Sequence, residues 1–230
     1  MANDAELGYL ESSQLLTTTS GRDWSPDVLL AVAERSSLRN TGWPIGLVIR
    51  TDDVSPVPTV QGVELRINQR RAERWTDYWS FRRDGSYYFM RLFEEEHESP
   101  SFQTSEGHPE RALWFDMRIW RIAEVLLHSA ALYRELDIPP DEPYTLEVSH
   151  LGLKDREFWT TEAGRFIRRG HFCREQSTTW RKEVTQDYIL SNVRDLTAEV
   201  ANEVFVLFDF MRLQRETIDQ ITDRFLKSRL

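Results

Sequence analysis

Glu124 and His128 are the two side chains whose spacing most resembles that of metal ligands. They lie four residues apart in a segment with helical periodicity, so both project from one helix face, and His150 or His171 could supply a third ligand. A closed metal site needs a second set of spaced ligands, which the sequence lacks. We therefore expect the pair to lie on the solvent face of its helix, and no cofactor is predicted. A metal-dependent hydrolase or nuclease is kept as the weaker alternative.

His171 and Cys173 form a second pair that could do chemistry, as the base and nucleophile of a thiol enzyme. A catalytic thiol needs a base at hydrogen-bonding distance and an oxyanion hole. Two residues along a strand separate their Cα atoms by roughly 6.5 Å, which is loose for such a dyad. We expect instead a half-buried thiol beside an exposed histidine. Because Cys173 is the only cysteine, no internal disulfide can form, and this suits a reducing compartment.

Charge segregation is the most informative feature of the sequence. Residues 66–83 (the first arginine cluster) hold six arginines against two carboxylates, and residues 154–182 (the second arginine cluster) hold eight Lys or Arg against four. Both clusters interleave cations with aromatic side chains, a composition that suits protein interfaces and stacked nucleotides. The simpler interpretation is that the arginines face water while the aromatics face the core. The binding hypothesis predicts one recognition face made from both clusters, with the candidates Trp79, Arg82, Arg83, Arg165, Arg168, Arg169, His171 and Arg174.

The overall charge limits the classes of partner. The formal net charge is −9, which argues against non-specific binding to nucleic acid or to anionic membranes. No apolar run approaches the length that a membrane-spanning helix needs, and residues 1–10 lack the pattern of a signal peptide. We therefore expect a cytoplasmic protein with no membrane partner. Residues 94–98, rich in glutamate, are expected to form a solvated acidic loop.

The positioning elements follow from periodicity and turn signals. Residues 1–23 are polar and are interpreted as a flexible N-terminal tail, and residues 24–230 as a single domain. Ser25 before Pro26 predicts the start of a helix over 26–38. Asp84-Gly85 between two aromatic runs predicts a hairpin. Strands are predicted at 45–50, 63–67, 75–81, 87–93, 113–115 and 144–148.

Three further helices are predicted, at 118–136, 188–207 and 211–227, from apolar residues at three- and four-residue spacing. The order of elements predicts an α+β fold, with a largely antiparallel mixed sheet covered by an N-terminal helix, a central helix and C-terminal helices. The apolar stripe of the C-terminal helices could fold back onto the sheet, which we favour, or pair with another chain to give a homo-oligomer.

Several short segments together resemble an uncharacterised bacterial domain that often follows an AlbA_2 (Schlafen-like) DNA-binding or ATP-binding module. The resembling segments are Thr41-Gly42-Trp43-Pro44, Asp77-Tyr78-Trp79, Asp84-Gly85-Ser86-Tyr87-Tyr88, Phe115-Asp116, residues 119–128 and Leu151-Gly152-Leu153. The 230 residues contain no AlbA_2 module, so its nucleotide chemistry is not carried over, and the family brings no catalytic residues. The resemblance implies an accessory role in sensing or in protein contact. It places that role in a bacterial multiprotein system, for which antiviral defence is one candidate.

Two hypotheses from different classes follow. The first is a non-catalytic interaction or sensor domain that binds a partner protein through its arginine–aromatic surface. The second is a nucleotide- or nucleic-acid-binding module in which Arg82, Arg168 and Arg169 contact phosphates. A cleft in which both arginine clusters converge would favour the second, and an exposed basic face without a pocket would favour the first.

Overall fold

The computed structural model of the chain describes residues 7–18, 21–38, 43–68, 76–96, 109, 111–162, 165, 167–209 and 211–228. Within these residues the main sheet has seven antiparallel strands in the order β2-β3-β4-β5-β1-β7-β9, and a small parallel sheet joins β6 to β8. The strands are β1 (Tyr9–Leu16), β2 (Val57–Thr59), β3 (Gly62–Asn68), β4 (Thr76–Arg82), β5 (Tyr87–Leu92), β6 (Ala112–Trp114), β7 (Tyr144–Leu151), β8 (Glu157–Trp159) and β9 (Ser177–Val184).

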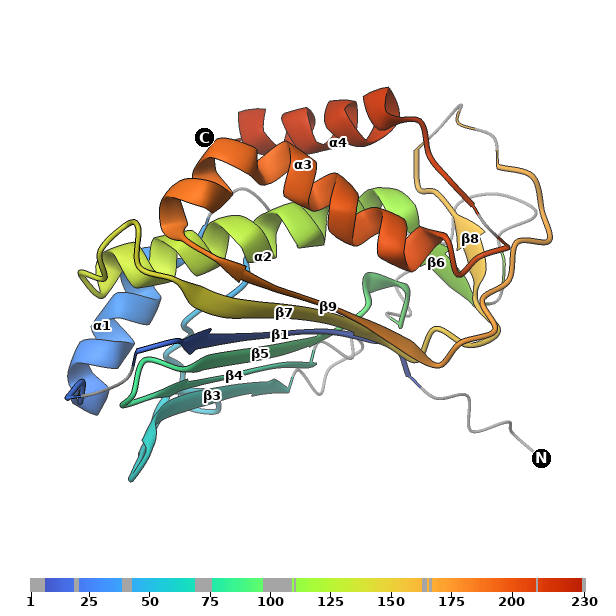
Figure 1. The fold of residues 1–230 in the computed structure, drawn as a ribbon. Helices are drawn as coiled ribbons and strands as arrows, with labels where there is room; N and C mark the ends of the chain where they lie inside the picture. Colours follow the sequence, from blue (N-terminus) through green and yellow to red (C-terminus); the bar gives the residue numbers. More distant parts are fainter. Residues whose placement is uncertain are drawn as a thin grey trace.

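The helices gather on one face of the main sheet. They are α1 (Pro26–Ser36), α2 (Phe115–Glu135), α3 (Gln186–Phe205) and α4 (Arg215–Lys227), with a short 3-10 turn, η1, at Glu94–Glu96. Figure 1 shows α2 and α3 lying across the sheet, α4 above them and α1 at one end. This arrangement confirms the predicted α+β class, with an antiparallel sheet covered by N-terminal, central and C-terminal helices.

The central helix α2 is buried on nearly all sides. Its apolar residues, such as Ile119, Ile122 and Leu126, are expected in a core, and each has no exposed surface. Helices α3 and α4 cover the side of α2 that faces away from the sheet, and α4 packs Phe225 toward Trp120 with ring centroids 6.5 Å apart. The C-terminal apolar stripe therefore folds back within its own chain, as favoured over pairing with another chain, although it packs mainly on α2 and not directly on the sheet.

Strand β1 corrects the prediction of a flexible tail. Residues 9–16 pair with β5 on one side and with β7 on the other, in registers such as Ser12 opposite Phe89 and Val148. Leu10 and Leu16 point into the core and are almost fully buried. The segment was missed because Ser12, Ser13 and Gln14 interrupt its apolar residues, although Leu10, Ser12, Gln14 and Leu16 alternate with the more exposed positions.

Two local predictions had opposite outcomes. The Asp84-Gly85 hairpin between β4 and β5 is confirmed: Gly85 has a φ of +84°, Arg82 N–H donates to Ser86 at 2.8 Å, and the Asp84 carboxylate accepts from Ser86 N–H at 2.9 Å. The strand predicted at 45–50 is wrong, because this segment is irregular. Its backbone is held by side chains instead of a ladder, as where the Trp79 indole donates to the Leu47 carbonyl at 3.1 Å.

Removing residues 1–17 should abolish cooperative folding. Loss of β1 leaves β5 and β7 without their shared partner and removes Leu10 and Leu16 from the core. The milder change Leu10→Ala should lower the free energy of unfolding by about 2–5 kcal/mol, through lost burial and the cavity left behind. Urea denaturation followed by circular dichroism measures both. A truncated chain that unfolds at the same urea concentration as the full chain would restore the tail interpretation.

Candidate functional site

A buried ionic network lies where α2 crosses the sheet. Arg118, Arg121, Glu124 and His128 are all less than 5% exposed. The prediction that Glu124 and His128 lie on the solvent face is therefore wrong. Their side chains lie on the face of α2 that is turned toward the sheet. The opposite face of α2 is not exposed to solvent either, because α3 and α4 cover it.

Glu94 of η1 is the centre of the network. Its carboxylate accepts a hydrogen bond from Arg121 Nε at 2.5 Å and forms an ion pair with the guanidinium of Arg118. Burial disfavours the charged carboxylate, but the guanidinium groups of Arg121, Arg118 and Arg91 outweigh it and lower the pKa of Glu94. The prediction of a solvated acidic loop at residues 94–98 is therefore wrong for Glu94, which is only 3% exposed.

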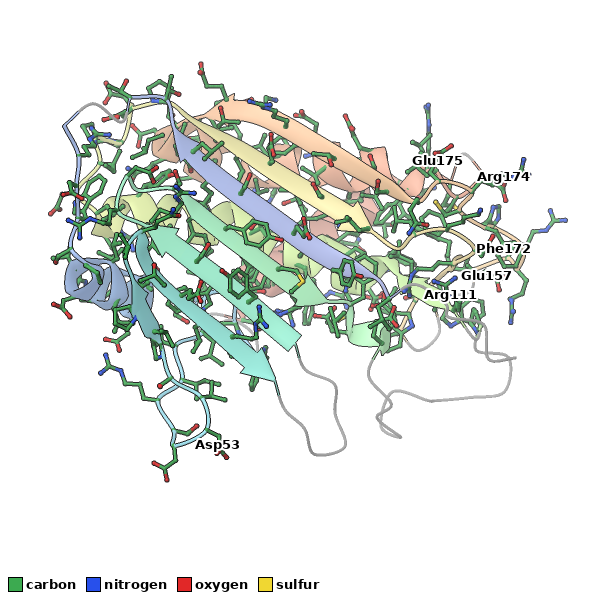
Figure 2. All side chains as sticks on the ribbon, turned by 90° about the horizontal axis from the view of Figure 1, so that it is seen from below. Asp53, Arg111, Glu157, Phe172, Arg174 and Glu175 are labelled. Atoms are coloured by element: carbon green, nitrogen blue, oxygen red, sulfur yellow. The ribbon has the colours of Figure 1, made fainter. Side chains whose placement is uncertain are left out.

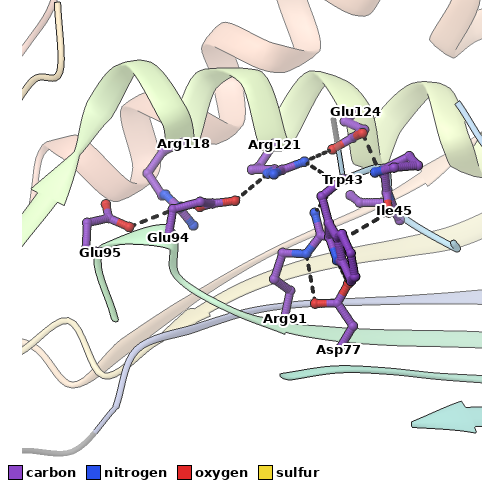
Figure 3. A network of polar contacts seen from close by, with 10 residues as sticks. Trp43, Ile45, Asp77, Arg91, Glu94, Glu95, Arg118, Arg121 and Glu124 are labelled. Atoms are coloured by element: carbon purple, nitrogen blue, oxygen red, sulfur yellow. Dashed lines mark hydrogen bonds and ion pairs between the residues drawn. The ribbon is translucent and has the colours of Figure 1, made fainter. Parts of the chain in front are cut away.

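A second ion pair, between Asp77 of β4 and Arg91 of β5, extends the network to the irregular segment after α1 (Figure 3). Arg91 donates to Asp77 through Nε at 3.0 Å and through its terminal nitrogen at 2.5 Å, and it also donates to the carbonyl oxygens of Trp43 and Pro44. The Trp43 indole donates to Asp77 at 2.8 Å. A pair buried this deeply is stable only when its remaining hydrogen-bonding capacity is met, and these backbone contacts meet it.

Glu124 completes the network and is not available as a metal ligand. Its carboxylate accepts from Arg121 at 2.5 Å and from Ile45 N–H at 3.4 Å. The described residues contain no group of three side chains placed to hold a metal ion. The metal-site hypothesis therefore finds no geometric support in this part of the chain.

His128 and His150 are buried as neutral bases. The His128 ring lies 5.3 Å from that of Tyr87 and its Nε2 abuts Gly46, where a Cβ would approach within 2.4 Å. The His150 ring lies 6.2 Å from Phe93. Burial lowers the pKa of His128 to about 4, and burial together with the nearby charge of Arg118 lowers the pKa of His150 to about 3.

The first arginine cluster is divided between the core and the surface. Trp79 is 1% exposed and belongs to the core, so its assignment as a binding residue is wrong. Arg83 forms a two-pronged pair with Asp23, at 2.6 and 2.8 Å, and Arg82 lies 3.9 Å from Asp84. The arginines at 70, 71 and 74 lie outside the described residues.

The surface candidates of the first arginine cluster lie at the opposite end of the sheet from the second cluster. Arg82 and Arg83 lead into the β4–β5 turn, beside Tyr87, which pairs with Gln14 of β1. The chain between β7 and β9, which carries the second cluster, starts after Leu151, which pairs with Tyr9 at the other end of β1. Tyr9 and Gln14 are five positions apart along β1, which corresponds to roughly 17 Å of extended strand. Arg82 and Arg83 therefore do not share one face with the candidates of the second cluster, and the predicted single recognition face is wrong for these two residues.

The second arginine cluster keeps an exposed arginine–aromatic surface, which we call the basic end: Trp159, Arg168, Arg169, Phe172 and Arg174. The Arg174 side chain is 87% exposed, and its nearest acidic neighbour, Asp209, is 3.8 Å away. Phe172 is 46% exposed although it is a large apolar side chain. Figure 2 shows Phe172 and Arg174 pointing outward at this end of the molecule, close to Arg111, Glu157 and Glu175.

Acidic and aromatic neighbours fix part of the basic end. Arg169 donates to Glu157 at 2.8 Å, and its guanidinium lies 5.3 Å from the Trp159 ring centroid. Glu157 also accepts from Gly170 N–H at 2.7 Å, so one buried carboxylate holds the backbone and the side chain of this loop. Arg168 is exposed and makes no ion pair with the described residues. The surface is therefore partly ordered before any ligand arrives.

The remaining candidates are placed differently. Arg165 pairs with Glu162 at 2.7 Å and lines a shallow depression of about 390 Å³ with Gln220, Asp223, Arg224 and Lys227. Cys173 is fully buried, and burial raises the pKa of its thiol. His171 turns its Nδ1 inward, where it has no partner in the described part of the chain. The sequence expected a half-buried thiol beside an exposed histidine, so the two side chains are more deeply placed than predicted.

Comparisons with protein-family models, with curated proteins and with solved structures give no match to this chain. Within the described residues, no helix combines the length and apolar character needed to cross a membrane.

Glu94→Gln should be strongly destabilising. The change removes a buried charge and leaves Arg118 and Arg121 without full compensation, which costs about 3–5 kcal/mol of unfolding free energy. Glu34→Gln is the matched control, because Glu34 pairs with Arg50 at the surface, and its loss should cost less than about 1 kcal/mol. Chemical denaturation of both variants checks this, and equal effects would contradict the central role of Glu94.

The unfolding free energy should fall as the pH drops from 6.5 to 5. The unfolded chain protonates His128 and His150 in this range, whereas the folded chain keeps both neutral, so each contributes a loss of about 2 kcal/mol. Denaturation of wild type and His150→Leu across this range checks the prediction, since the variant should lose roughly half of the slope. If the two pH profiles run parallel, His150 is not buried as a neutral base.

Proposed function

We propose that this chain is a non-catalytic interaction domain that binds a partner protein through the basic end. The observation that supports this proposal is the exposure of Phe172 in a segment that also carries the exposed Arg168 and Arg174. The Arg174 side chain is 87% exposed, and its ion pair with Asp209 is long, at 3.8 Å. Arginine and aromatic side chains dominate the binding energy of protein interfaces. A large apolar side chain left partly in water gains from being covered by a partner.

The chemistry of the basic end favours a partner surface with carboxylates around an apolar pocket. Arg168 and Arg174 are each able to form paired hydrogen bonds with a carboxylate. Phe172 would fill the apolar pocket, and Arg169, already held by Glu157 and Trp159, would need little further ordering. An interface side chain that is ordered in advance loses less conformational entropy on binding.

A nucleic acid is the less favoured ligand. The charge of −9 opposes the approach of a long polyanion, and Arg82 lies at the other end of the sheet from the segment that carries Arg168 and Arg169. The AlbA_2-associated family likeness stays a proposal beside this one and agrees with an accessory, partner-binding role in a bacterial system.

The test compares three forms of the full chain. Tagged wild type, the double variant Arg168→Glu/Phe172→Ala and the control Arg82→Glu are used for affinity capture from the source cells, with quantitative mass spectrometry. We expect a protein that wild type and Arg82→Glu retain equally and that the double variant loses at least tenfold. All three should show the same thermal unfolding, because the altered side chains are exposed.

Two outcomes would contradict the proposal. One is capture that the double variant leaves unchanged. The other is binding of the wild type to a labelled single-stranded or duplex oligonucleotide, measured by fluorescence anisotropy, that falls steeply with salt and disappears in the double variant. The second outcome would assign the basic end to nucleic acid.

A further inference from the structure

The two edges of the main sheet are built differently. β2, at one edge, has three residues and includes Pro58, whose ring nitrogen cannot donate to another strand. β9, at the other edge, has eight residues, contains neither proline nor glycine, and pairs only with β7 among the described strands. An edge strand of this length offers a row of unpaired N–H and C=O groups to a further strand.

Side chains alternate along β9 in a way that limits what can be added. Trp180 and Lys182 point toward α3, where both contact Glu199. Arg181 and Glu183 alternate with them and belong to the opposite sheet face, where Arg181 pairs with Glu147 at 3.2 Å. An added antiparallel strand must match this alternation, because directly opposite residues share one face.

We infer that β9 pairs with β9 of a second copy of this chain, in an antiparallel register centred on Lys182. In this register Arg181 lies opposite Glu183 of the second copy, and Glu183 lies opposite Arg181 of the second copy. The strand is therefore complementary in charge to itself. On the other face, Trp180 lies opposite Val184 of the second copy, also twice. A two-fold axis perpendicular to the sheet generates both sets of pairs.

Neighbouring registers are less favourable. Centring the pair on Arg181 would bring the two copies of that arginine together, and like charges directly opposite each other are destabilising. Centring it on Trp180 would oppose Arg181 to Thr179 and use neither charge pair. Centring it on Lys182 opposes two ammonium groups, but each is already bonded to both oxygens of its own Glu199, at 2.8 and 3.1 Å.

An exposed aromatic ring lies beside the proposed axis. Tyr188, at the start of α3, is 41% exposed, and the Lys182 ammonium lies 5.6 Å from its ring centroid. A two-fold axis at Lys182 would bring the two copies of Tyr188 toward each other. The apolar stripes of α3 and α4 are covered within the chain, so the alternative of a homo-oligomer through the C-terminal helices is replaced by one through the β9 edge.

Charge reversal tests the register. By sedimentation equilibrium the wild type should dimerise reversibly, and Arg181→Glu or Glu183→Arg alone should weaken the dimer at least tenfold, since each creates two like-charge pairs. The double variant Arg181→Glu/Glu183→Arg should recover to within about threefold of wild type, because opposite charges again face each other. Arg66→Glu, at an exposed position of β3, is the control and should leave the dimer unchanged.

A cross-link provides the second measurement. Lys182→Cys should form a disulfide-linked dimer on mild oxidation, because the two copies of the axial residue lie directly opposite, and Thr178→Cys should not. Three results would overturn the inference. The wild type could stay monomeric, the dimer could keep its affinity in both single charge reversals, or a segment of a different protein could occupy the β9 edge. None of these results bears on the basic end, which is a separate surface.

Discussion

The charge of Glu94 inside the protein is the constraint on which the surrounding structure depends. A buried carboxylate without compensation is very costly, so η1, α2 and the irregular segment after α1 must stay together. Arg118 and Arg121 approach Glu94 from α2, and Arg121 and Arg91 both donate to the Trp43 carbonyl. The network thereby fixes the position of α2 over the sheet and anchors a segment that has no regular secondary structure.

Much of the fold could be predicted from local pattern. The hairpin at Asp84-Gly85, the alternating β3 and the long α2 follow from turn chemistry and periodicity. What failed was the inference of exposure from polarity. Glu94, Arg121 and Glu124 are charged, but they are buried because they satisfy one another, and pairing between segments far apart in sequence leaves no local signal. One indication was available: Arg121 and Glu124 lie within a helix whose apolar residues occupy more than one face, which is typical of a helix buried all round.

The arginine clusters show the same limit at the scale of the candidate site. Composition identified the exposed cations of the basic end correctly as surface groups, and it placed Trp79 wrongly because alternation alone does not say which face of a strand is covered. The distance of Arg82 and Arg83 from the second cluster could not be predicted without the strand order. In β1, Ser12 and Gln14 are buried although polar, so an interior strand of the sheet carried a weak apolar signal.

The position of β1 affects how the chain can fold during synthesis. Among the described strands β1 is made before the others, but one of its two neighbours, β7, follows more than a hundred residues later, as in the contact of Ser13 with Glu147, 134 positions apart. The hairpin of β4 and β5 can form early and can capture β1. The far edge of β1 then stays open until residues 144–151 emerge. The nascent chain thus passes through a long interval in which a future interior strand is an unprotected edge, and such edges are where newly made chains associate wrongly or recruit chaperones.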